Sequence, residues 1–107
     1  MTTFDKREEA FEKKFAVDEE LKFKAEARSN RLLGLWAAEK LGLSGEAASA
    51  YGRETVAAAF TEGGEAAVLK KVIADLAAKG IAVTLDDIRA RWGEFFAQAA
   101  AQVKAGV

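Results

Sequence analysis

The stretch LLGLWAAEKLGLS, residues 32–44, decides the architecture because it ends one helix and begins another. Gly42 stands where a glycine in the left-handed conformation caps a helix, and Leu43 supplies the hydrophobic contact that accompanies such caps. Ser44 is a favourable N-cap for the helix that follows. We therefore expect one helix to end near Leu41 and a second to begin after Ser44, with a short turn between them.

Similar signals divide the rest of the chain. The pair Gly63-Gly64 is expected to end the second helix. Gly80 followed by Ile81 repeats the glycine–apolar cap, and Thr84 is an N-cap candidate for a further helix. These signals predict four helices joined by short turns.

Each predicted helix carries an apolar face at helical spacing. In the first helix the face consists of Leu21, Ala25, Leu32, Leu35 and Trp36. In the second it consists of Ala48, Tyr51, Thr55, Val56, Ala59 and Phe60, and in the third of Leu69, Val72, Ile73 and Leu76. In the fourth it consists of Leu85, Ile88, Trp92, Phe95, Phe96, Ala99 and Val103. No segment alternates apolar and polar residues as a strand would, so the pattern predicts an all-α four-helix bundle with antiparallel neighbours.

Composition excludes several classes of function. The chain of 107 residues has room for one domain, and it contains no Cys and no His. It therefore lacks disulfides, thiolate metal sites and the usual general base. A net charge of −1 with interspersed signs does not fit nucleic acid, no apolar run could cross a bilayer, and the start of the chain has no apolar signal core. We expect a cytoplasmic protein that is not an enzyme and holds no metal or cofactor.

Two local clusters are better explained by helix ends than by chemistry. Gly63-Gly64 lacks the spacing of a phosphate-binding loop, so a helix–helix turn is the better interpretation. Asp86 and Asp87, close to Arg89, stand in a first helical turn, where acids suit the helix dipole.

Aromatic side chains leave a ligand-binding alternative open. Four of them at helical spacing favour a hydrophobic core, although they could also line a pocket between helices. They are Trp36, Trp92, Phe95 and Phe96. Tyr51 and Arg53 could help to hold a small ligand, without a positive sign for it. The alternatives are therefore a nucleotide- or small-ligand-binding bundle and a generic scaffold or adaptor.

The N-terminal segment has a pattern of its own. Residues 5–31 hold eight acids and eight bases, whereas the chain after Leu32 is rich in Ala and Leu. On a helix Phe4, Phe11 and Phe15 fall within an arc of about 40°, roughly 90° from the expected apolar face of the first helix. This angle favours a segment outside the bundle whose Phe residues are covered by a groove in a partner protein. The alternative, that the Phe residues fold back onto the bundle, carries similar weight from periodicity alone.

A long and specific run adds a family resemblance. The run F-x-x-x-F-A-x-D-x-E-L-x-F-K-A-x-A-R-x-N spans Phe11 to Asn30, and the opening MTTFDKREEAF, the segment around Tyr51 and the closing DDIRARW belong to the same likeness. The chain resembles, over essentially its whole length, the zeta subunit of alphaproteobacterial F-type ATP synthases.

The resemblance implies an inhibitor of ATP hydrolysis with two parts. Residues 1–17 would be a mobile, partly helical inhibitory segment, and residues 18–107 a four-helix bundle. The segment would enter a catalytic α/β interface of the ATP synthase headpiece, contact the γ subunit of the central stalk and block rotation. The matching candidates for contact are Phe4, Arg7, Phe11 and Phe15. The free protein would be a monomer without cofactors, peripheral to the inner membrane through the ATP synthase.

Overall fold

A computed structural model describes residues 19–106 of the chain, and in this range it contains four α-helices and no strand. The helices are α2 (Glu19–Lys40), α3 (Gly45–Ala58), α4 (Gly64–Ala78) and α5 (Leu85–Lys104). The predicted all-α, four-helix architecture is confirmed, and the turns after α2 and α4 fall where the glycine and capping signals placed them. The end of the second helix was predicted too late, because α3 ends at Ala58 and the Gly63-Gly64 pair begins α4 instead.

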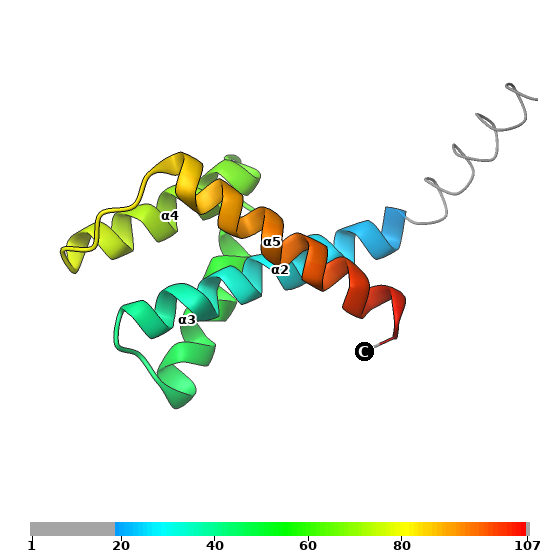
Figure 1. Ribbon diagram of the computed structural model, residues 1–107, viewed down its shortest axis with the longest axis horizontal. Coiled ribbons are helices and arrows are strands. Elements are labelled where there is room, and N and C mark those ends of the chain that lie inside the picture. Colours follow the sequence, from blue (N-terminus) through cyan, green and yellow to red (C-terminus); the bar gives the residue numbers. More distant parts are fainter. Residues whose placement is uncertain (1–18, 107) are drawn as a thin grey trace, which may run out of the picture.

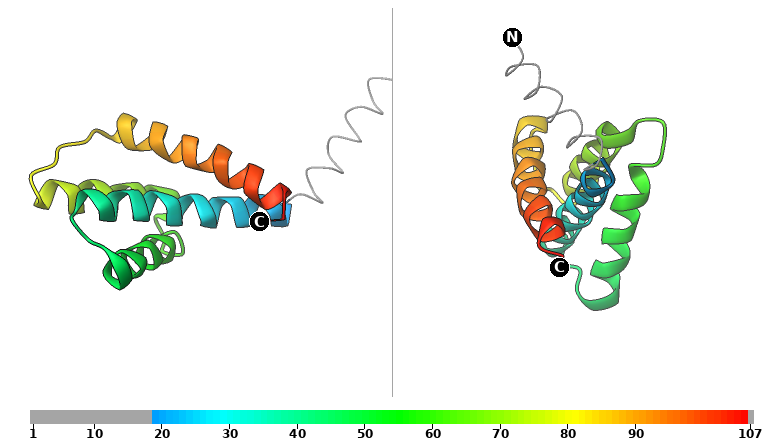
Figure 2. Two further views of the ribbon diagram at one scale, coloured as in Figure 1. Left: turned by 60° about the horizontal axis from the view of Figure 1, so that its bottom comes forward. Right: turned by 90° about the vertical axis from the view of Figure 1, so that its right-hand side faces the viewer.

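Helix α2 is the centre of the arrangement. It packs against α3 on one side and α5 on the other, and α4 contacts all three of the other helices (Figure 1). Helix α5 runs antiparallel to α2, and the two helices come together where α2 begins and α5 ends (Figure 2). At the opposite end they diverge, and α4 packs against both of them. The start of α2 therefore has fewer helices around it than its C-terminal half.

Both predicted glycine caps are present. Gly42 has φ +79°, and the Leu43 N–H donates to the Ala38 carbonyl at 2.9 Å, which closes the last turn of α2. Gly80 has φ +80°, and the Ile81 N–H closes α4 in the same way. A residue with a Cβ would be strained at either position, so glycine is the favoured residue at both helix ends.

The two predicted N-caps differ in their hydrogen bonds. The Thr84 hydroxyl accepts from the Asp87 N–H at 3.0 Å, and an Asp87 carboxylate oxygen accepts from the Thr84 N–H at 3.2 Å. This reciprocal pair is a capping box, which explains the acid at this position structurally. Ser44 occupies the N-cap position of α3, but its hydroxyl makes no capping hydrogen bond.

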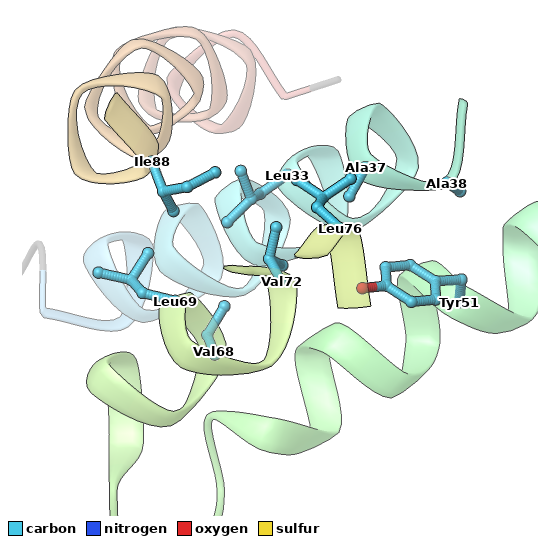
Figure 3. Close-up of a cluster of buried hydrophobic side chains, with 9 residues drawn as sticks. All are labelled: Leu33, Ala37, Ala38, Tyr51, Val68, Leu69, Val72, Leu76 and Ile88. Carbon is cyan, nitrogen blue, oxygen red and sulfur yellow. The ribbon is translucent and has the colours of Figure 1, made fainter. Parts of the chain in front are cut away.

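The core joins all four helices around one cluster of buried side chains. Leu33 of α2, Val72 of α4 and Ile88 of α5 point toward one another (Figure 3). The cluster consists of Leu33, Ala37, Ala38, Tyr51, Val68, Leu69, Val72, Leu76 and Ile88. Partly buried residues from every turn and helix pack around it, including Trp36, Trp92 and Phe95. The core interpretation of these three aromatic side chains is therefore confirmed.

The buried face of α2 differs from the expected one. Leu32, Leu35 and Trp36 are only half-buried, whereas Leu33 and Ala37 are fully buried. The expected face followed the largest apolar side chains. The observed face is wider because α3 and α5 flank α2, and it includes small and polar residues. The buried residues of α2 are Ala25, Ser29, Asn30, Leu33, Gly34, Ala37 and Ala38.

The observed buried face of α2 lies closer in helical angle to the N-terminal Phe residues than the expected face does. Extrapolated along one helix, the observed buried face of α2 lies roughly 50° from the Phe stripe, rather than roughly 90°. Helical phase therefore no longer separates the N-terminal segment from the bundle. The segment itself, residues 1–17, lies outside the described residues.

A close crossing of α2 and α3 explains the buried small residues. A Cβ at Gly34 would stand 2.6 Å from the Thr55 Oγ1 atom and 3.0 Å from the Gly52 Cα atom. The Thr55 hydroxyl donates to the Tyr51 carbonyl at 2.8 Å, so it is both buried and satisfied. Glycine at position 34 lets the two backbones approach more closely than any other residue would.

Candidate functional site

The residues predicted to contact a partner, namely Phe4, Arg7, Phe11 and Phe15, all lie outside the described range. Their arrangement stays a prediction. The part of the described chain that adjoins them is the beginning of α2, at Glu19.

Two Phe side chains form an exposed patch close to this junction. The side chain of Phe23, in the second turn of α2, is 56% exposed, and that of Phe60 is 69% exposed. Their ring centroids lie 6.2 Å apart with an interplanar angle of 57°. Phe60 was expected in the core, but α3 ends at Ala58, and the following turn carries the ring past the bundle. We call Phe23 and Phe60 together the Phe23–Phe60 patch.

A groove of about 200 Å³ lies beside this patch, between α2, the end of α3 and α5. Its lining is Phe23, Glu26, Ala27, Asn30, Val56, Ala59, Phe60, Glu65 and Trp92. Apolar side chains thus form most of the walls, and the two glutamates supply negative charge.

The floor of the groove is fixed by hydrogen bonds between α2 and α5. The indole N–H of Trp92 donates to the Asn30 Oδ1 atom at 2.7 Å, and the Ser29 hydroxyl donates to the Trp92 carbonyl at 3.1 Å. The Phe96 ring stacks on Trp92 with centroids 5.2 Å apart. Asn30 is only 5% exposed and Ser29 fully buried, so the floor is a rigid part of the fold.

Positive charge gathers on the other side of Phe23. A second, more open groove includes Lys24, Arg28 and Arg31 together with Phe23. Lys24 forms an exposed ion pair with Glu20 at 3.5 Å, and Arg28 donates weakly to Gln102 at 3.4 Å. The Phe23 ring therefore stands between an acidic and a basic surface.

The residues suggested for small-ligand binding do not form a shared site. The Tyr51 hydroxyl is turned inward and donates to the Asp75 Oδ2 atom at 2.7 Å. Arg53 points elsewhere and donates to the Glu46 Oε1 atom at 2.6 Å. Both groups are occupied by contacts within the protein, so these two residues give the ligand-binding alternative no support.

The cluster around Tyr51 connects α3 with α4. The Lys71 ammonium group lies 3.0 Å from Asp75, 3.7 Å from Glu54 and 4.8 Å from the centroid of the Tyr51 ring. Burial raises the pKa of Tyr51, and the hydrogen bond to Asp75 and nearby carboxylates raise it further. Burial raises the pKa of Asp75 as well, but hydrogen bonds from Tyr51 and Lys71 and the Lys71 charge outweigh it, and the net direction is down. This cluster is a polar connection between two helices.

Other possible chemistry is not supported in residues 19–106. Gly64, with φ +55°, belongs to the turn that begins α4, which confirms the structural interpretation of the glycine pair. No group of three or more potential metal ligands comes together within the described range. Among the four described helices, none is long and apolar enough to cross a membrane.

Comparison with known proteins gives one match. No curated protein matches the chain. A family model, described as ATPase inhibitor subunit zeta, matches residues 1–102. Because this match spans nearly the whole sequence, the chain belongs to the ATPase inhibitor subunit zeta family, whose members regulate the ATP synthase and are not catalysts.

Proposed function

We propose that residues 1–17 block ATP hydrolysis by inserting as a helix into a catalytic α/β interface of the ATP synthase headpiece. There they would contact the γ subunit of the central stalk and stop rotation. The observation that carries the proposal is the family match, which begins at residue 1 and so includes this segment. An inhibitory role toward the ATP synthase follows from the family, and the insertion is the step that we add.

The physical dimensions suit this mechanism. As a helix, the residues from Phe4 to Val17 would be about 21 Å long, and three Phe rings would share one side of it. A rod of this length can hold apart or together two surfaces that must move during turnover. Phe4, Phe11 and Phe15 would provide apolar anchors, and Arg7 would provide a charged contact.

In this mechanism the four described helices would act as a folded body to which the inhibitory segment is tethered. An isolated helix of this length is marginal in water, so the segment gains from being tethered to a folded body that raises its effective concentration. We expect the free protein to be a cytoplasmic monomer that reaches the membrane only through the ATP synthase. Neither nucleic acid nor a cofactor enters this mechanism.

Titration into purified ATP synthase, with the rate of ATP hydrolysis recorded, tests the function directly. The full chain should inhibit, and a chain without residues 1–17 should not, while its melting temperature stays nearly unchanged. A truncated chain that inhibits like the full one would place the activity in the helical body. A truncated chain that unfolds would assign residues 1–17 to the core.

A double substitution tests the proposed anchors. Buried aromatic anchors cost more than about 2 kcal/mol on truncation, so Phe11→Ala with Phe15→Ala should weaken inhibition at least about tenfold. Glu9→Ala is the matched control, because position 9 lies roughly 140° around the helix from the Phe stripe. Equal inhibition by the double variant and the wild type would remove these Phe residues from the interface.

A further inference from the structure

We propose that the groove beside the Phe23–Phe60 patch binds a small organic cation in which apolar groups surround a positively charged nitrogen. Quaternary ammonium compounds such as choline have this chemistry. Aromatic rings would contact the apolar surface of the cation, and two glutamates would balance its charge. All the residues that line the groove belong to the four described helices and their turns. This binding activity would be separate from the proposed inhibition of ATP hydrolysis.

Three aromatic side chains from different parts of the fold line the groove. They are Phe23 of α2, Phe60 of the turn after α3 and Trp92 of α5. The rings of Phe23 and Phe60 lie 6.2 Å apart and are tilted by 57°, so they present two surfaces that are not parallel. The face of an aromatic ring is negative and attracts a cation within about 6 Å of the ring centroid. Several rings around one concave surface are the arrangement by which proteins recognise quaternary ammonium groups.

The hydrogen bonds of Trp92 favour a ligand of this class. The indole N–H already donates to the Asn30 Oδ1 atom at 2.7 Å, and Asn30 is only 5% exposed. The Phe96 ring, which does not line the groove, stacks on the indole at 5.2 Å. Trp92 therefore offers a ligand its π surface and no free hydrogen-bond donor. The ring is also held in place before binding, which reduces the loss of conformational entropy when a ligand binds.

Two carboxylates determine the sign of the charge that the groove accepts. Glu26 of α2 and Glu65 of α4 are among the lining residues, whereas no Lys or Arg is. Within residues 19–106, several other acids form ion pairs, but Glu26 and Glu65 form neither an ion pair nor a side-chain hydrogen bond. Two carboxylates without a counter-charge attract a cation and repel an anion.

The size of the groove limits the ligand to one small group. The groove has a volume of about 200 Å³. An apolar protein cavity of about 150 Å³ holds benzene, and a quaternary ammonium group is similar in size. The same group occurs at the head of phosphatidylcholine, but a phosphate adjoins it there, and the carboxylates of Glu26 and Glu65 would repel that phosphate. We therefore assign the groove to a free cation.

Titration of the full chain with choline chloride, followed by NMR, measures the binding. We expect the amide resonances of the groove and the indole N–H resonance of Trp92 to shift saturably, with a dissociation constant in about the millimolar range. Dimethylbutanol, the neutral analogue of choline in which a carbon atom replaces the charged nitrogen, should bind at least about threefold more weakly. Sodium chloride at the same concentration controls for ionic strength.

Variants separate the contribution of the rings from that of the charge. Phe60→Leu keeps an apolar side chain without a π surface and should weaken choline binding about threefold, whereas Phe60→Tyr keeps the π surface and should bind like the wild type. Glu26→Gln should weaken binding about threefold as well, because it removes one of the two carboxylates. Glu39→Gln is the matched control, since Glu39 is an exposed acid of the same helix outside the groove. Circular dichroism checks that each variant keeps the melting temperature of the wild type.

The outcomes decide between recognition of a cation and its alternatives. Equal binding of choline and dimethylbutanol, or equal choline binding by Phe60→Leu and the wild type, would overturn the inference. So would a loss in Glu39→Gln as large as that in Glu26→Gln, which would indicate attraction to the net charge alone. Sedimentation of the protein with phosphatidylcholine vesicles, if Phe60→Leu prevents it, would assign the groove to a lipid surface and also overturn the free ligand. None of these results depends on whether the protein inhibits ATP hydrolysis.

Discussion

The two halves of α2 differ in their surroundings. In the C-terminal half Leu33 and Ala37 are fully buried beneath α3, α4 and α5. Near the beginning of the helix Phe23 is largely exposed and contacts the ring of Phe60, and this end of α2 lines a groove together with the last turns of α5. One helix thus belongs to a core at one end and carries an open apolar surface at the other. We therefore expect truncation of a large apolar side chain to lower the stability of the fold more in the first region than in the second.

The largest expected difference is in the free energy of unfolding, between one truncation in each half of α2. Leu33→Ala should lower the free energy of unfolding by about 2–5 kcal/mol, because it leaves a cavity in a fully enclosed place. Phe23→Ala removes a larger side chain, yet should cost less than about 1 kcal/mol, because the ring is mostly in water already. Denaturation in urea measures both. Equal losses would show that the beginning of α2 contributes to the core as much as its C-terminal half.

A second, smaller effect comes from the same substitution at two glycines. Gly34→Ala would bring a Cβ to 2.6 Å from the Thr55 Oγ1 atom, and should destabilise the fold by about 1–3 kcal/mol. Gly93→Ala, in α5, meets nothing within 4 Å, and should stabilise the fold by up to about 1 kcal/mol through helix propensity. Opposite signs in thermal unfolding would confirm that close helix crossing, and not glycine itself, decides the outcome. Stabilisation by both would mean that α2 and α3 can separate without cost.

Local signals were enough to predict the turns after α2 and α4, but not the end of α3 at Ala58. Gly42 and Gly80 cap helices because of their own backbone conformation, and Thr84 and Asp87 form a box within a few residues of each other. Such contacts depend on nearby sequence alone. The all-α fold and these two turns could therefore be predicted.

Packing between distant residues could not be predicted in this way. Gly34 is buried because Thr55 and Gly52 of another helix approach it, and no periodicity of large apolar residues indicates that. The groove beside Phe23 depends on Trp92 meeting Asn30, which lies 62 positions away in the sequence. Phe60 fits a helical period but stands beyond the end of its helix. The residues of the proposed inhibitory segment were suggested by their spacing and by a family resemblance, and they stay a prediction.

The smallest predicted effect concerns pH and lies in the polar connection between α3 and α4. The pKa of Asp75 is lowered in the fold, so the stability it contributes is present above its unfolded pKa of about 4 and is lost as pH falls below that value. The pKa of Tyr51 is raised, so its contribution is present below about pH 10 and is lost as pH rises above it. Without His, the free energy of unfolding should stay nearly flat between about pH 6 and 8.

Tyr51→Phe should cost about 1 kcal/mol at neutral pH, because Asp75 loses a hydrogen-bond donor, and should reduce the alkaline decline. Urea denaturation of both proteins across the pH range measures this, and an alkaline decline of equal size in the variant would show that lysines, and not Tyr51, cause it.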